Sequence, residues 1–169
     1  MGSKARASQR GHRVCLASAV EISSERVVGG TRFLHIVPEH RRLEIGSTWI
    51  AKQWRRTAIN TEAKFLMLEH AFEKHVEFMA DALNEPSRMA ILRIGATEEG
   101  TFRDYIITAA GEIHDAVFYS FYSNIESEWP PAKVRLQEMM ALPYRREIAM
   151  QWGAAHRCFY HRHDYMRRS

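Results

Sequence analysis

The chain has 169 residues, of which 46% are apolar, and 24 Lys and Arg against 20 Asp and Glu. This length and apolar content suit one globular domain with its own core, and no apolar run approaches the roughly 20 residues that a membrane span needs. The basic excess is concentrated at the two ends, which argues against a nucleic-acid-binding module with a basic face across its fold. Cys15 and Cys158 show no disulfide or zinc spacing, so a cytoplasmic protein without a metal is expected.

Strands are predicted first along the chain. Alternation over residues 14–22, a break at SSER, and a second alternating run over 27–37 predict a hairpin. Residues 41–50 form a third predicted strand. Its two faces are expected to hold Leu43, Ile45, Ser47 and Trp49 on one side, and Glu44, Gly46, Thr48 and Ile50 on the other.

From Ile59 the apolar period changes to that of a helix, which continues to Phe72. Its apolar stripe is wide enough that this long helix should be mostly buried. Residues 76–83 are predicted as a strand. Asn84 then caps a short helix, which Gly95 ends.

Two strands are predicted over residues 100–108 and 115–123, with a turn at 110–111 between them. Pro130 and Pro131 then open a last helix, which runs to residue 142. The element order predicts a mixed α/β (α+β) fold, with a twisted, largely antiparallel sheet flanked by helices.

The segment WRRTAINTEA, residues 54–63, lies between the third strand and the long helix. The first turn of a helix leaves amides without an internal partner, and these amides with the helix dipole attract an anion. Arg55 and Arg56 add positive charge, and Asn60 is also placed to cap the helix. Short side-chain donors follow at Thr57, Asn60 and Thr61.

The segment predicts a binding site for a phosphate or pyrophosphate, although a helix start with solvated arginines explains the same residues. A P-loop motif and a dinucleotide fingerprint are both absent.

Three stretches resemble, in this order, the GNAT superfamily of N-acetyltransferases, in the branch of ribosomal-protein N-terminal acetyltransferases: RRLEIGSTWIAKQWRRTAINTEAKFLMLEHAFE, DALNEPSRMAILRIGATEEG and SEWP. The resemblance covers about two thirds of the chain. It implies an acetyl-CoA-binding domain over residues 14–142, between a basic arm of residues 1–13 and a basic extension of residues 143–169. GNAT domains usually begin with a strand and two helices, so this domain is expected to be shortened at its N-terminus.

The resemblance also implies which residues bind acetyl-CoA, without a metal. In the family the strand before the loop bonds the pantetheine arm through its backbone, and a loop of pattern Arg/Gln-x-x-Gly-x-Gly/Ala wraps the pyrophosphate. Arg55 matches the first loop position, while Ala58 and Asn60 replace the glycines. A β-carbon at Ala58 fits a right-handed backbone and costs about 1 kcal/mol in a left-handed one. The predicted cofactor-binding residues are Trp49, Ile50, Arg55, Arg56, Thr57, Ala58, Ile59, Asn60, Thr61, Asn84 and Ser87.

A second family motif, Asn-x-x-Ser near the cofactor thiol, is matched by Asn84 and Ser87. These two residues lie one turn apart on the same side of a helix. A plain capped helix accounts for the same pair.

The reaction implied by the resemblance is direct attack of an amine on the thioester, with an oxyanion held by amides of a bulged strand. Glu44 is the candidate base, because its predicted face is the one that the family turns to the acceptor. A solvated strand glutamate is the alternative for Glu44. Ser87 and Tyr119 compete as the acid, and most strand tyrosines only pack.

Two functions follow from these predictions. The first is an N-acetyltransferase that acts on a primary amine, either a protein N-terminus or a small molecule. The second is a degenerate GNAT-fold module that binds CoA or a protein partner without turnover. A missing acceptor lid would expose apolar surface, which a homodimer would cover. Neither membrane nor nucleic acid is an expected partner.

Overall fold

The computed structural model describes residues 15–21, 23–71, 75–122, 129–140 and 148–152. The strands in these residues are β1 Cys15–Glu21, β2 Val27–Val37, β3 Arg42–Ile50, β4 His75–Asp81, β5 Thr97–Ile107, β6 Ile113–Tyr122 and β7 Ile148–Trp152. The α-helices are α1 Ile59–His70, α2 Glu85–Arg93 and α3 Trp129–Met139. Two short 3-10 helices, Pro38–His40 and Lys52–Trp54, flank β3.

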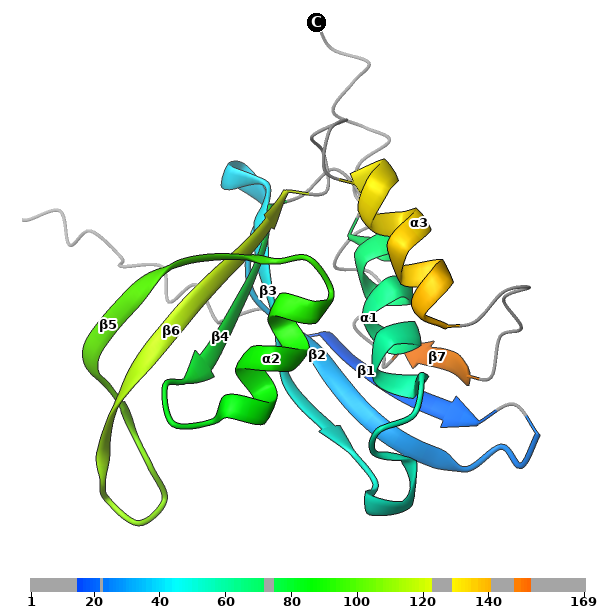
Figure 1. Cartoon of the computed structure of the whole chain (residues 1–169), viewed down its shortest axis with the longest axis horizontal. Coiled ribbons are helices and arrows are strands. Elements are labelled where there is room, and N and C mark those ends of the chain that lie inside the picture. The colour runs from blue at the N-terminus through cyan, green and yellow to red at the C-terminus, as the bar shows by residue number, and fades with distance from the viewer. Residues whose placement is uncertain (1–14, 22, 72–74, 123–128, 141–147, 153–169) are drawn as a thin grey trace, which may run out of the picture.

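The strands form a seven-stranded sheet in the order β5-β6-β4-β3-β2-β1-β7. β3 and β4 are parallel, and every other neighbouring pair is antiparallel. The three α-helices lie on one face of this sheet (Figure 1). The predicted mixed α/β class with a largely antiparallel sheet is therefore confirmed.

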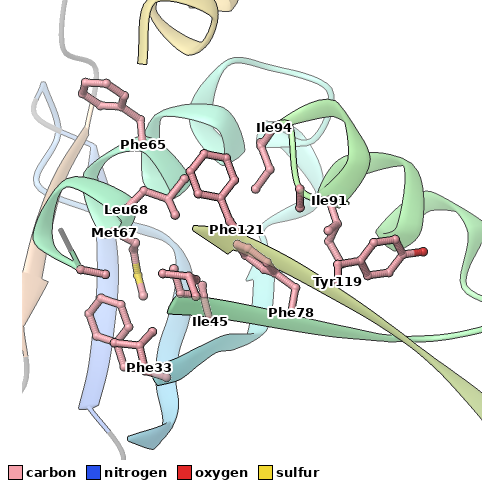
Figure 2. Close-up of a cluster of buried hydrophobic side chains, with 14 of the residues drawn as sticks. Phe33, Ile45, Phe65, Met67, Leu68, Phe78, Ile91, Ile94, Tyr119 and Phe121 are labelled. Carbon is pink, nitrogen blue, oxygen red and sulfur yellow. The ribbon is translucent and has the colours of Figure 1, made fainter. Parts of the chain in front are cut away.

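The core lies between the sheet and the helices, and Figure 2 shows its centre. Alternate residues of the central strands point into it, because strand side chains alternate between faces. The strands and helices contribute Phe33, Leu43, Ile45, Val76, Phe78, Val117, Tyr119, Phe121, Phe65, Met67 and Leu68, each no more than 3% exposed. Eight of the twelve residues of α1 are buried, as the wide apolar stripe predicted.

β3 and β4 pair along only part of their length. Their parallel register consists of three rows, Arg42 with His75, Leu43 with Val76, and Glu44 with Glu77. Beyond these rows the two strands diverge (Figure 1). The β4-facing edge of β3 after Glu44 consequently has no strand partner among the described residues, and a space opens between the strands.

A bulge changes the faces of β3. Gly30 of β2 pairs with Trp49 and Arg32 pairs with Gly46, so two steps along β2 face three along β3. Ser47 has φ 48, a left-handed backbone. The extra residue shifts the alternation, and Thr48 contacts Lys64 of α1 on the helix side of the sheet. The predicted faces of β3 are therefore wrong after Gly46.

Other differences from the predicted elements are local. β4 ends at Asp81 rather than residue 83, because the Asp81 carboxylate accepts a hydrogen bond from the Leu83 amide and turns the chain. β5 begins at Thr97 rather than residue 100. α3 begins at Trp129, whose ring is buried against Phe65 and Phe121.

β7 was not predicted. It lies in the segment of residues 143–169, which the sequence analysis treated as a basic extension, and it pairs antiparallel with β1. Met150 of β7 packs against both buried clusters of the core. Part of that segment thus belongs to the sheet.

Candidate functional site

A cleft of about 1050 Å³ lies where β3 and β4 diverge. The bulged half of β3 forms one wall, α2 forms the other, and the loop before α1 closes one end. Its lining residues are 45–50, 54–57, Asn60, Lys64, Phe78, Met79, Asn84, Pro86, Ser87 and 89–94. This is the volume of a pocket that binds a small molecule or cofactor.

The start of α1 is capped differently from the prediction. The N-cap residue is Ala58, which makes no side-chain cap bond. The Thr57 hydroxyl instead accepts from the Ile59 amide at 3.4 Å and donates to the Trp54 carbonyl at 2.7 Å. Asn60 is therefore not the cap, because it is the second residue of the helix, whereas a cap residue precedes the first.

Several polar groups at this end of the cleft have no hydrogen-bond partner among the residues that the structure describes. The Glu62 amide bonds Ala58 and the Ile59 amide bonds Thr57, which leaves the Asn60 and Thr61 amides without an acceptor in the first turn. Buried polar atoms of two cleft-lining residues, Trp54 Nε1 and Asn60 Oδ1, also lack a hydrogen-bond partner among the described residues. Unpaired donors at a helix N-terminus form an anion-binding site.

The two arginines of the loop lie at the exposed rim of the cleft. The Arg55 Nε donates to the Ile50 carbonyl at 3.2 Å, which ties the loop to the end of β3. Arg56 has φ 63, so the left-handed residue of the loop is Arg56. Ala58 is right-handed, with φ −68 and ψ −14, and its β-carbon therefore carries no left-handed penalty.

Asn84 and Ser87 line the opposite end of the cleft. The side-chain oxygen Oδ1 of Asn84 accepts from the Ser87 amide at 3.2 Å, which confirms Asn84 as the cap of α2. Gly95 follows α2 with φ 99, the left-handed conformation that ends a helix.

Three predicted cofactor-binding residues do not line the cleft. Ala58 and Ile59 are not among its lining residues, and Ile59 is fully buried in a core cluster. The Thr61 hydroxyl accepts from Arg93 Nη2 at 3.1 Å. Arg93 itself lines the cleft, and the sequence analysis did not identify it. The other eight predicted residues line the cleft: Trp49, Ile50, Arg55, Arg56, Thr57, Asn60, Asn84 and Ser87.

Glu44 and Tyr119, two of the three predicted catalytic residues, lie outside the lining of the cleft. Glu44 is 7% exposed, and its carboxylate is 2.7 Å from His35 Nδ1. Tyr119 is 1% exposed at the edge of the core cluster (Figure 2), where its hydroxyl accepts from Arg88 Nε at 3.0 Å. Ser87 is the one predicted catalytic residue that the cleft includes.

Lys64 lines the cleft and was missed. It is 5% exposed, and burial lowers the pKa of its amine to about 7. The signal was present in the sequence, because Lys64 follows Asn60 by one helical turn and interrupts an otherwise buried stripe.

The described part of the chain contains no group of three or more His, Cys, Asp or Glu side chains that could hold a metal. The histidine-rich segment of residues 156–164 lies outside the described residues. Among the helices described, none is long and apolar enough to cross a membrane.

Comparison with known proteins gives one consistent family. The model of the acetyltransferase (GNAT) domain matches residues 3–97. YdaF of Bacillus subtilis (strain 168), by name a candidate ribosomal N-acetyltransferase, is 38% identical over 98 residues, which are 56% of this chain and 51% of that protein.

Solved structures share the fold. The crystal structure of a GCN5-related N-acetyltransferase from Brucella melitensis has a TM-score of 0.69 and 29% identity, over 75% of this chain and 57% of that one. RimJ of Mycobacterium smegmatis in complex with CoA-disulfide has a TM-score of 0.58 and 24% identity, over 67% of this chain and 55% of that one.

The chain spans just over half the length of these relatives. The matched region nevertheless includes β3, the loop of residues 54–57, α1 and α2, which are the elements that build the cleft. The chain belongs to the GNAT family of acetyltransferases.

Proposed function

We propose that the protein transfers an acetyl group from acetyl-CoA to a primary amine. The observation that carries this proposal is the set of unpaired donors at the start of α1, beside Arg55 and Arg56. Free amides, the positive end of the helix dipole and two guanidinium groups fit the diphosphate of CoA. These groups are neutral or cationic donors, which suit an anionic diphosphate and not a metal cation.

The edge of β3 fits the next part of acetyl-CoA. The pantetheine arm carries two amide groups, and the unpaired edge of β3 after Glu44 offers main-chain groups of the kind that extend a sheet. Trp49 and Ile50 line the cleft along this edge. Arg55 and Arg56 would hold the diphosphate end of acetyl-CoA, and Asn84 and Ser87 would contact the thiol end.

The chemistry requires a base for the incoming amine and a proton for the leaving thiolate. Glu44 is the proposed base, held by His35 at 2.7 Å on the face of the sheet away from α1. Ser87 is the proposed acid, because it lines the cleft while the Tyr119 hydroxyl is engaged by Arg88. The bulge at Ser47 supplies the main-chain donors that hold the developing oxyanion.

The acceptor that we propose is a protein N-terminus or a small-molecule amine in the cytoplasm. The name of the Bacillus relative refers to the ribosome, which supports a protein N-terminus. A module that binds CoA without turnover is the second candidate. It is favoured by the position of Glu44 outside the lining of the cleft.

Calorimetry with acetyl-CoA tests the binding step. Arg55→Ala combined with Arg56→Ala should weaken the affinity about 10- to 100-fold, because both side chains are exposed and together should contribute about as much as one charge-assisted bond to phosphate, about 1.5–3 kcal/mol. Arg103→Ala combined with Arg135→Ala is the matched control, since both residues are exposed and lie outside the cleft. An unchanged affinity in the first variant refutes the diphosphate seat.

A thiol-release assay against a panel of amines and N-terminal peptides tests turnover. Release of CoA that depends on one class of amine supports the acetyltransferase. Tight acetyl-CoA binding with no release on any amine supports the binding module instead.

A further inference from the structure

A buried lysine lies behind the bulge of β3. Lys64 projects from the middle of α1 and is 5% exposed, although it lines the cleft. Its Nζ is 5.8 Å from the centroid of the Phe78 ring on β4. Burying an amine is costly, and a lysine in such a place is retained for a reason other than stability.

The Lys64 amine is bonded to the two hydroxyls that face each other across the bulge. It donates to Thr48 Oγ1 at 2.6 Å and to Thr31 Oγ1 at 3.3 Å. Thr48 belongs to the bulged part of β3, and Thr31 is the residue of β2 between the two rows where the register shifts.

The hydroxyls continue the network into the strand itself. Thr31 Oγ1 donates to the Gly46 carbonyl at 3.3 Å and lies 3.0 Å from Thr48 Oγ1. The two ends of the bulge, Gly46 and Thr48, are therefore tied to one amine through side chains. Between them, Ser47 adopts the left-handed backbone that a non-glycine residue avoids.

A bulge of this kind persists only where its surroundings determine it. The normal ladder is interrupted on the β2 side by the shifted register, and on the β4 side the strand has no partner after Glu44 within the described residues. With both strand ladders interrupted, the hydrogen bonds of Lys64, Thr31 and Thr48 hold residues 46–48 in this shape. These same residues line the cleft.

We propose that Lys64 is a positioning residue, which acts through Thr48 and Thr31 to hold the bulge of β3 in the shape that receives the acetyl thioester. This inference rests on the proposed function, because it assigns the bulge to acetyl-CoA. A neutral or a charged Lys64 can play the part, since either form has the two N–H donors that the hydroxyls need.

The test compares Lys64→Met with the parent protein in two measurements. Thermal unfolding should show that Lys64→Met is at least as stable, because an apolar chain of similar length replaces a buried amine. Calorimetry should show that its affinity for acetyl-CoA falls about tenfold, the value of one lost hydrogen bond, while that for CoA falls less than about threefold. Lys133→Met is the matched control, since Lys133 pairs with Glu69 outside the cleft.

Thr48→Val and Thr48→Ser provide the second arm. Valine loses the hydroxyl and serine keeps it, so Thr48→Val should reproduce the loss of acetyl-CoA affinity and Thr48→Ser should restore the parent value. The comparison of Thr48→Val with Thr48→Ser tests the inference even if Lys64→Met fails to fold.

The inference is overturned if the parent and Lys64→Met bind acetyl-CoA equally, or if Thr48→Val and Thr48→Ser behave alike. It is also overturned if acetyl-CoA and CoA lose the same affinity together with a lowered melting temperature. A parent protein that binds no acetyl-CoA refutes the proposed function itself, and that result is separate from all of these.

Discussion

The cleft and the opposite face of the sheet differ in whether their polar side chains have hydrogen-bond partners. In the cleft, Trp54 Nε1 and Asn60 Oδ1 are buried without a partner among the described residues. The opposite face consists of the residues that alternate with the core positions of β3, β4 and β6, together with their neighbours on β5. Four acidic side chains on this face each bond a neighbouring side chain. These pairs are Glu44 with His35, Glu77 with Arg42, Asp81 with His114, and Glu99 with Ser120.

This difference indicates which region is completed by a ligand. A buried polar atom left unpaired costs about 1–3 kcal/mol, so a fold retains one chiefly where something else satisfies it. The cleft has such atoms, whereas the four acidic groups named on the opposite face each have a partner. We therefore expect changes in the cleft to alter affinity, and changes on the opposite face to alter turnover or stability.

The largest expected effect is on the opposite face, at Glu44. Glu44→Gln should lower kcat about 100-fold or more if Glu44 is the base, because general-base catalysis contributes about that factor. The affinity for acetyl-CoA should stay within about twofold of the parent, since Glu44 does not line the cleft. Both values come from steady-state kinetics with a reactive amine and from calorimetry.

Glu77→Gln is the control for Glu44→Gln. Glu77 is the direct neighbour of Glu44 on β4, and it is bonded to Arg42 at 3.0 Å. It should leave kcat within about threefold of the parent, the scale of one partly exposed ion pair. A Glu44→Gln variant as active as this control would show that Glu44 takes no part in the proposed reaction and that the opposite face has a structural role only.

The second effect concerns the amine buried behind the cleft. The pKa of Lys64 is lowered from 10.5 to about 7 in the folded protein, so between these values the unfolded chain binds more protons. The free energy of unfolding should therefore rise with pH in this window, by about 2 kcal/mol between pH 7 and 9. Lys64→Met should abolish that rise, as measured by urea denaturation, whereas Lys133→Met should keep it.

A third variant separates stability from binding within the cleft. Asn60→Ala removes the unpaired carbonyl oxygen and introduces a better helix former, so it should raise the free energy of unfolding by about 1 kcal/mol. Acetyl-CoA affinity should fall about tenfold, because Asn60 lines the cleft and its side-chain NH2 group is a donor for a phosphate oxygen. Gln137→Ala on α3 controls for helix propensity alone. A loss of stability in Asn60→Ala would show that Asn60 is already satisfied.

The sequence predicted the fold class, which the structure confirms, and an anion seat, which stays a prediction; both rest on local signals. Periods of two and of 3.6 residues mark strands and helices. Arg55 and Arg56 stand before a helix, and Asn84 precedes another as its cap. None of these features needs a distant contact to be recognised.

The missing parts depend on contacts between distant segments. Nothing in the alternation of residues 41–50 shows that Ser47 is inserted, because the bulge appears only against β2. The Tyr119 hydroxyl is hydrogen-bonded to Arg88, 31 positions away in the chain. The Glu44 carboxylate is hydrogen-bonded to His35 across a register shift between β2 and β3. β7 is five residues long, which is too short a pattern to distinguish from a loop.

The smallest expected effect is on a pair that joins the two regions. One oxygen of Asp81 binds His114 Nδ1 at 2.6 Å on the opposite face, and the other accepts from the Leu83 amide in the turn that leads to Asn84. The hydrogen bond to Asp81 raises the pKa of His114 above its ordinary 6.5, and the bond to His114 lowers the pKa of Asp81 below 3.8. The stability from His114 is complete below 6.5 and is lost as pH rises through its folded pKa. That from Asp81 is complete above 3.8 and is lost as pH falls.

The pair should thus stabilise the fold most between pH 3.8 and 6.5. His114→Ala is expected to lower the free energy of unfolding more at pH 5 than at pH 8, in urea titrations read by tryptophan fluorescence, while the exposed His40→Ala changes neither value. The Asp81 carboxylate also accepts from the Leu83 amide in the turn before α2. We therefore expect His114→Ala to leave acetyl-CoA affinity unchanged, because the bond to Leu83 is kept. A lower affinity would mean that His114 is also needed to hold that turn. An equal loss of stability at both pH values would mean that His114 packs against Asp81 but that protonation of His114 does not strengthen the pair. The interaction between the opposite face and the turn at the cleft would then be independent of pH.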